Sequence, residues 1–179
     1  MRDIMLDIET LSTDSYGVIT SISAVQFDIV TGQVFSTFEV ALDIKEQLDL
    51  GSVIDASTVS WWFSQDEKAI LATFRLQRVS VLSALTSFNE WINSLKLKNN
   101  DVKLWGNGCV FDNVMVRNLY KKAGIEFVLP FWCDTDVRTL VALSGINVKD
   151  FKFEGTKHYG IDDCKHQIKY CHAAYKELK

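Results

Sequence analysis

The sequence predicts an α/β protein with a mixed central β-sheet flanked by α-helices. Three apolar, strand-like stretches follow one another in the first 42 residues, and helix-like and strand-like stretches then alternate along the chain. Strands joined by hairpins are antiparallel, whereas strands separated by helices run parallel, so this order indicates a mixed sheet. Apolar residues make up 47% of the 179 residues, and a chain of this length buries about 70% of its unfolded surface. We therefore expect one domain over residues 1–179.

The first half of the chain is predicted to form three strands followed by helices. The strands are expected at 4–8, 19–27 and 33–42, and Gly32 between the last two favours an antiparallel hairpin. Ser64 and Glu67 form a capping-box pattern, which predicts the start of a helix. A stripe of apolar residues at helical spacing predicts another helix over 80–95, carried by Leu82, Leu85, Phe88, Trp91, Ile92 and Leu95.

The second half is predicted to alternate between strands and helices. Glycines close two of its helices, because glycine readily takes the left-handed conformation that ends a helix. The expected elements are a strand over 102–105, a helix from Asp112 to Gly124, a strand over 131–133, a helix over 135–144 closed by Gly145, and a last helix from about 161.

Charge and composition exclude several classes of protein. Nineteen Lys and Arg against 23 Asp and Glu give a net charge of −4, which excludes a basic coat for binding nucleic acid. An acidic metal site is compatible with this net charge, because four carboxylates neutralised by bound cations would leave the other charges balanced. No apolar run approaches the roughly 20 residues of a membrane helix, and no signal peptide is visible. The four Cys lack a C-x-x-C pair, so we expect free thiols and a cytoplasmic location.

Asp7 and Glu9 are the first unusual feature. They lie two residues apart on an apolar strand, so both side chains leave the same face. Two carboxylates on one buried face repel each other and lose hydration, and a divalent cation removes both costs. The alternative is that Glu9 ends the strand and points to solvent.

Two further acidic elements follow. Asp112 opens a helix after a Gly-rich strand end, and it is either a metal ligand or a plain N-cap. His158 and Asp163 flank the start of the last helix. A neutral His can take a proton from water and a nearby carboxylate can hold a metal; the alternative is a surface His before the acidic first turn of a helix.

Together these residues resemble the DEDD exonuclease superfamily. Asp7-Ile8-Glu9-Thr10-Leu11 resembles the first motif, Phe111-Asp112 the second, and His158-x-x-x-x-Asp163 the third motif of the DEDDh branch, to which RNase T and proofreading exonucleases belong. The resemblance is greatest to the small RNase AS-like exoribonucleases of bacteria and phages, through two further segments, Trp61-Trp62-Phe63-Ser64-Gln65 and Asp136-Val137-Arg138-Thr139-Leu140. The match spans residue 7 to about 175.

The resemblance implies an RNase H-like fold and a 3′→5′ exonuclease that releases nucleoside 5′-monophosphates from single-stranded RNA or DNA, with RNA favoured. Two Mg²⁺ or Mn²⁺ ions, about 4 Å apart, would be held by four carboxylates. One ion would activate the attacking water, whose proton His158 accepts, and the other would stabilise the leaving 3′ oxygen. The family also suggests a homodimer. The implied metal ligands are Asp7, Glu9, Asp112 and Asp163.

The sequence leaves the general base open at one point. Tyr159 also lies four residues before Asp163, which is the spacing of the DEDDy branch. We favour His158, because histidine titrates near neutrality and tyrosine near pH 10. The chain departs from many DEDDh enzymes in having Gly108, with Asn107 before it, where they place an Asn four residues before the second-motif Asp.

Six residues are candidates for substrate binding. Adjacent Trp61 and Trp62 cannot share one helix face, so one is expected in the core and the other is free to stack on a base. Arg138 is expected to contact phosphate or to pair with Asp134. The remaining candidates are Thr10 for the terminal sugar, Leu11 as a wedge between bases, and Phe111 as a stacking surface or a core residue.

Two rival functions remain at this stage, an RNase H-type endonuclease and a catalytically inert nucleic-acid-binding or scaffold module on the same fold. The first gives no role to the His158–Asp163 pair, and the second does not require every acidic residue to be present. A Cys/His cluster in the last helix also resembles a metal site, but its spacing favours core thiols, and the lysines of that helix favour a solvated face. The cluster is Cys164, His166, Cys171 and His172.

Overall fold

The computed structural model describes residues 3–97 and 101–179, and in these residues six strands form one sheet. The order across the sheet is β4-β3-β2-β1-β5-β6. β2 pairs antiparallel with β1 and β3, whereas the β1–β5, β5–β6 and β3–β4 pairs are parallel, so the predicted mixed sheet is confirmed. The strands are β1 (Asp3–Thr10), β2 (Ile19–Phe27), β3 (Val34–Leu42), β4 (Arg78–Val79), β5 (Lys103–Gly106) and β6 (Asp134–Asp136).

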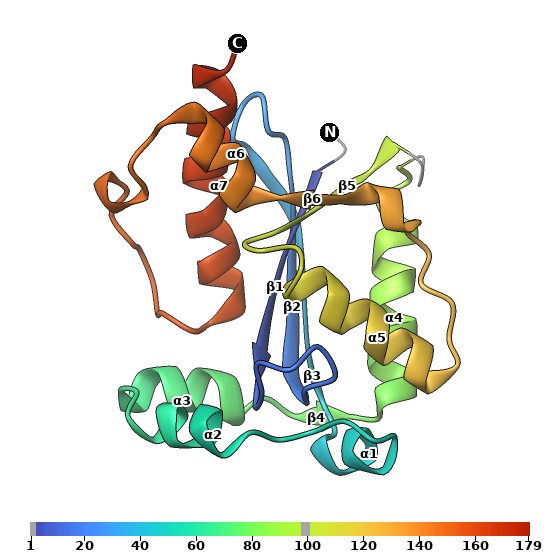
Figure 1. Cartoon of the computed structure of the whole chain (residues 1–179). Coiled ribbons are helices and arrows are strands. Elements are labelled where there is room, and N and C mark those ends of the chain that lie inside the picture. The colour runs from blue at the N-terminus through green and yellow to red at the C-terminus, as the bar shows by residue number, and fades with distance from the viewer. Residues whose placement is uncertain (1–2, 98–100) are drawn as a thin grey trace.

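Helices cover both faces of the sheet (Figure 1). α4 and α5 lie on one face, α6 and α7 lie on the other, and α2 and α3 lie at one end of the long strands. None of the described helices is both long and apolar enough to cross a membrane. The helices are α1 (Ile44–Asp49), α2 (Ala56–Phe63), α3 (Glu67–Phe74), α4 (Val81–Ser94), α5 (Asp112–Ala123), α6 (Val137–Ser144) and α7 (Gly160–Glu177).

Alternation along β1 divides the buried side chains between two cores. Leu6 and Ile8 pack into the larger core with α4 and α5, whereas Met5 packs into the second core with α6 and α7. Asp7 and Glu9 share the face of Met5, because side chains alternate along a strand. Both carboxylates therefore point toward the side that α7 covers.

The strand predicted over 131–133 is wrong. These residues form a 3₁₀ turn after Pro130, in which the Cys133 amide donates to the Pro130 carbonyl oxygen. The strand follows directly as β6, whose sequence Asp-Thr-Asp carries no apolar residue. Hydrophobicity therefore pointed to the wrong residues, because Phe131 and Trp132 are exposed while the polar strand completes the edge of the sheet.

Two predicted helix starts are also corrected. Ser64 is the C-cap of α2, and α3 is capped instead by Asp66, whose carboxylate accepts from the Ala69 amide. Residue 135 belongs to β6, and α6 begins at Val137 after Asp136, which caps it. In both cases an Asp at the N-cap accepts a backbone N–H that the helix leaves unpaired.

Candidate active site

Asp7 and Glu9 lie at the end of β1 that faces the start of α7. The Asp7 Oδ1 atom accepts a 2.7 Å hydrogen bond from Nε2 of Gln167, a residue of α7. Glu9 is 8% exposed, so the alternative in which it points to solvent is wrong. The two acidic side chains are held where the sheet meets the helix.

Asp112 reaches the same place from the opposite side of β1. It is the first residue of α5, and its Oδ1 atom accepts a 3.3 Å hydrogen bond from the Ile8 amide of β1. The N-cap of α5 is Phe111, and no side chain caps that helix, so the N-cap interpretation of Asp112 is wrong. Asp112 is 5% exposed, which leaves its carboxylate among the other acidic groups rather than in solvent.

His158 and Asp163 complete the cluster from the start of α7. His158 adopts a left-handed backbone conformation (φ 62°), which is uncommon for a side-chain-bearing residue. The Thr73 hydroxyl of α3 donates a 2.8 Å hydrogen bond to the His158 carbonyl oxygen and holds this conformation. Ligand atoms of Glu9, His158 and Asp163 all lie within 4.8 Å of one another.

The four carboxylates have pKa values above those of ordinary acids. Burial raises the pKa of Asp7 and of Glu9 well above the usual range, and repulsion from neighbouring carboxylates adds to it. Burial also raises the pKa of Asp112 to about 7 and that of Asp163 to about 6. Without cations, the ionised form of these carboxylates is therefore disfavoured in the folded protein by burial and by mutual repulsion.

This donor set fits a hard divalent cation. The Asp163 Oδ2 atom is buried and has no hydrogen-bond partner among the described residues, although buried polar atoms are normally paired. Mg²⁺ and Mn²⁺ prefer carboxylate oxygens, and a bound cation would satisfy this atom and remove the repulsion. The unpaired oxygen and the raised pKa values are both what a metal site predicts.

His158 and Tyr159 face different partners. The Tyr159 hydroxyl donates a 3.1 Å hydrogen bond to Glu39 of β3, whereas the His158 ring lies beside Glu9 and Asp163. Burial, with help from Lys157, lowers the pKa of His158. A neutral imidazole at the acidic cluster can accept a proton, so the geometry favours His158 over Tyr159.

An open groove of about 480 Å³ leads to Glu9. Thr10, Trp61, Trp62 and Phe111 line it, so the structure brings four of the six substrate-binding candidates together. Trp62 is 4% exposed and its Nε1 donates to the Thr10 carbonyl oxygen, which places it in the core. Trp61 is 43% exposed and its ring meets the His158 ring edge-on.

The other two candidates lie outside the groove lining. Leu11 is 8% exposed and packs with Val18 and Trp62, so its role as a wedge between bases stays a prediction. Arg138 does not pair with Asp134, because Asp134 forms its ion pair with Arg117. The exposed Arg138 guanidinium lies instead against the backbone of Gly108.

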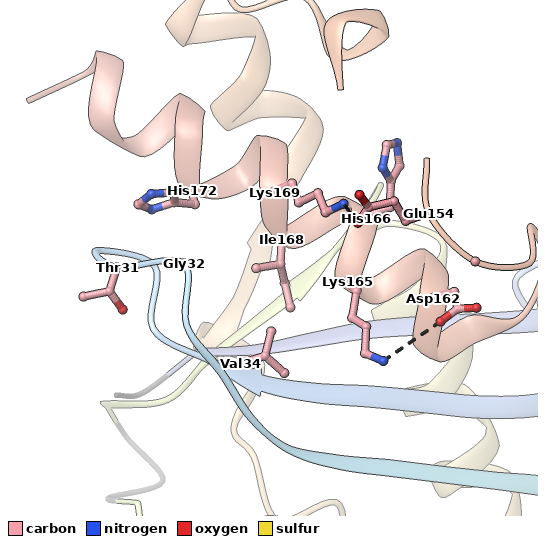
Figure 2. Close-up of a pocket in the computed structure, with 11 residues that line it drawn as sticks. Thr31, Gly32, Val34, Glu154, Asp162, Lys165, His166, Ile168, Lys169 and His172 are labelled. Carbon is pink, nitrogen blue, oxygen red and sulfur yellow. Dashed lines mark hydrogen bonds and ion pairs between the residues drawn. The ribbon is translucent and has the colours of Figure 1, made fainter. Parts of the chain in front are cut away.

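The Cys/His residues of α7 do not gather at one point. Cys164 and Cys171 are buried in the second core, as expected for core thiols. Figure 2 shows His166 and His172 on separate parts of a larger cavity of about 640 Å³. The lysines of this cavity pair with acids, Lys165 with Asp162 and Lys169 with Glu154.

Sequence reasoning missed two polar residues that hold the site. Gln167 lies one helical turn after Asp163 and therefore on the same face of α7, a spacing that offered a signal. Thr73 lies on a short helix 85 residues from His158, and nothing in its local sequence indicates the contact.

Several solved structures with the same architecture are nucleases. The nuclease domain of 3′hExo, a DEDDh family member bound to rAMP, matches with a TM-score of 0.65 at 11% identity, covering 97% of this chain and 91% of that one. The zinc-bound E. coli ExoI–ssDNA complex matches with a TM-score of 0.60 at 14% identity, covering 99% of this chain and 40% of that one. These matches confirm the predicted RNase H-like fold. No curated protein matches the chain.

The family comparison agrees with the acidic cluster. The model of the Rv2179c-like 3′-5′ exoribonuclease domain matches residues 2–175, nearly the whole chain. This match and the DEDDh structural neighbours favour neither the endonuclease nor the inert module. The chain belongs to the Rv2179c-like 3′-5′ exoribonuclease domain family and is a 3′-5′ exonuclease.

Proposed function

We propose that this exonuclease shortens single-stranded RNA from the 3′ end, uses two Mg²⁺ or Mn²⁺ ions, and releases nucleoside 5′-monophosphates. The observation that carries the proposal is the convergence of buried carboxylates and a neutral imidazole at one end of an aromatic groove. The single-domain organisation and the cytoplasmic location expected from the sequence stay predictions, and so does the homodimer that the family resemblance suggests.

Asp7, Glu9, Asp112 and Asp163 would hold the ions. When bound, divalent ions supply Lewis-acid stabilisation of the charge that develops during phosphodiester hydrolysis. The buried Asp163 Oδ2 atom and the raised carboxylate pKa values support this assignment. Gln167 would fix the orientation of the Asp7 carboxylate through its hydrogen bond.

His158 would be the general base. A water oxygen would form a bond to phosphorus while the bond between phosphorus and the 3′ oxygen of the preceding nucleotide breaks. The imidazole would take one water proton, and the leaving 3′ oxygen would take a proton from solvent. The lowered pKa of His158, caused mainly by burial, keeps the ring neutral and able to accept that proton near pH 7. The left-handed backbone, fixed by Thr73, presents the ring to Glu9 and Asp163.

The groove suits a terminal nucleoside. Trp61 and Phe111 offer aromatic surface on which a base can stack, and Thr10 and Glu9 line the same groove. RNA is favoured over DNA because the matching family model describes exoribonucleases.

Digestion of matched oligonucleotides tests the proposal. Single-stranded RNA and DNA of one sequence, labelled at the 5′ end, are incubated with the protein and Mn²⁺, with EDTA as the control. We expect a ladder of labelled products shortened from the 3′ end, faster for RNA, and chromatography should identify nucleoside 5′-monophosphates. Faster digestion of DNA, activity in EDTA, or cleavage of circular RNA would contradict the proposal.

A further inference from the structure

A third open cavity, of about 410 Å³, lies between α6, α7 and the loop after β5. Its charged lining residues are Arg138 and Lys149, joined by the polar side chains of Asn107, His166 and Tyr170. No carboxylate is among the described residues that line it, although the protein carries a net charge of −4. We name it the cationic cavity.

The cationic cavity adjoins the acidic cluster through Gly108. The Arg138 guanidinium lies 3.3 Å from the position that a Cβ atom on Gly108 would take, so it packs closely against the backbone of this loop. The Gly108 carbonyl oxygen accepts a hydrogen bond from the Asp112 amide. The loop that lines the cavity with Asn107 therefore leads directly into the helix that carries the Asp112 carboxylate. Burial raises the pKa of Asp112, and the nearby positive charge of Arg138 acts against that rise.

Arg138 is available to bind an anion. Asp134 is occupied by Arg117, which approaches both carboxylate oxygens, at 2.7 and 2.8 Å. Asp136, the other nearby acid, accepts hydrogen bonds from the Cys109 and Thr139 amides. Over residues 3–97 and 101–179, no carboxylate lies within ion-pair distance of Arg138 or Lys149.

The two cavities beside the acidic cluster differ in chemistry. The groove at Trp61 and Phe111 offers aromatic surface, which suits a nucleoside. The cationic cavity offers a guanidinium and an ammonium, which suit phosphate. The larger cavity of Figure 2 does not compete, because its two lysines already pair with acids.

We propose that the cationic cavity binds the phosphodiester backbone on the 5′ side of the scissile bond, through Arg138 and Lys149. The inference rests on the proposed function, in which the groove at Trp61 holds the 3′-terminal nucleoside. A strand would then run from the groove across the acidic cluster to the cationic cavity. This gives an acidic protein a local cationic contact for its polyanionic substrate.

Salt dependence of RNA binding tests the proposal. Binding of a fluorescent ten-nucleotide single-stranded RNA is measured by anisotropy in Ca²⁺, over a series of KCl concentrations, with a gel verifying that the RNA stays intact. The variants are Arg138→Gln and Lys149→Gln. The matched control is Lys121→Gln, which removes the same charge from an exposed position at the end of α5.

We expect each cavity variant to weaken RNA binding several-fold and to reduce the slope of log K against log salt by about 0.7. Lys121→Gln should leave the slope unchanged, and calorimetry should show that Lys149→Gln binds AMP as the wild type does. Unchanged slopes in both cavity variants, or an equal loss in Lys121→Gln, would overturn the inference. If Lys149→Gln weakened AMP binding as much as RNA binding, the inference would also be overturned, because AMP has no upstream phosphate. Absence of RNA digestion by the wild type would instead overturn the proposed function.

Discussion

The Thr73 hydroxyl donates a 2.8 Å hydrogen bond to the carbonyl oxygen of His158, 85 residues further along the chain. His158 has a positive φ of 62°, a conformation that costs free energy for any residue with a side chain and persists where neighbours hold it. Thr73 is 2% exposed and supplies such a constraint from α3. The orientation of His158, the proposed general base, therefore depends on a helix that carries none of the proposed metal ligands.

Replacement of Thr73 by Val removes this hydroxyl at nearly constant volume. A single hydrogen bond contributes about 1 kcal/mol, so we expect the turnover rate to fall roughly 5- to 10-fold. The loss should stay below that of His158→Ala, which removes a general base worth about 10²- to 10⁴-fold. The measurement is kcat on single-stranded RNA together with the NMR line shape of the His158 ring.

Thr73→Ser is the matched control, because it keeps the hydroxyl. It should retain kcat and the ring signal of the wild type. A Thr73→Val variant with unchanged kcat and unchanged ring signals would show that the hydrogen bond does not position His158.

Gln167→Leu tests the residue that holds Asp7. Partners that orient metal ligands typically contribute 10- to 100-fold to metal affinity. We expect Mn²⁺ affinity, measured by calorimetry, to fall by about that factor, and the rise in melting temperature on adding Mn²⁺ to shrink. Ile168→Val, a buried change at the next position of α7, should lower stability slightly and leave Mn²⁺ affinity unchanged. Equal Mn²⁺ affinities in wild type and Gln167→Leu would refute the role.

Trp61→Ala and Trp62→Ala should affect different properties, RNA binding in the first case and stability in the second. Trp62 is buried and hydrogen-bonded to Thr10, so its loss should cost about 3–5 kcal/mol of unfolding free energy. Trp61 is half-exposed in the groove, so its loss should leave most stability intact and weaken single-strand binding by about 1–3 kcal/mol. Denaturant unfolding and anisotropy measure the two quantities. Unchanged RNA binding in Trp61→Ala would exclude a stacking role.

The metal-free protein should lose stability as pH rises. Folding raises the pKa of Asp163 from 3.8 to about 6 and that of Asp112 from 3.8 to about 7. Between these unfolded and folded pKa values, the folded state holds protons that the unfolded chain has released. Stability then falls with increasing pH, up to the pKa values of the folded state. We expect a lower melting temperature in EDTA at pH 8 than at pH 5, and a larger stabilisation by Mn²⁺ at pH 8. A metal-free melting temperature that rises over this range would contradict the carboxylate assignment.

The acidic residues of the cluster could be singled out from the sequence because their environment made them unusual. Asp7 and Glu9 interrupt an apolar strand, and Asp112 and His158 occupy spacings that resemble a known motif. Gln167 was not predicted, because a polar residue on an amphipathic helix normally faces solvent, and only the packing of α7 on β1 buries it.

The place of β6, the choice between Trp61 and Trp62, and the cationic cavity depend on contacts between segments that are far apart in the sequence. β6 has no apolar residue, so its place in the sheet follows from pairing with β5 rather than from its own sequence. Adjacent positions on a helix predict that only one of Trp61 and Trp62 is buried. The position of α2 against Thr10 decides that it is Trp62. The cationic cavity joins residues from three separate segments, which no local pattern brings together.

The most direct test of the account is the rate at which Asp163→Asn digests 5′-labelled single-stranded RNA at saturating Mn²⁺. Asp163 carries one of the buried side-chain oxygens that lack a hydrogen-bond partner among the described residues, and its pKa is raised chiefly by burial. We predict that the variant loses turnover, keeps the wild-type circular dichroism spectrum, and melts slightly higher than wild type in EDTA at pH 8. Digestion at a rate near that of the wild type would contradict the claim that this acidic cluster is the catalytic metal site.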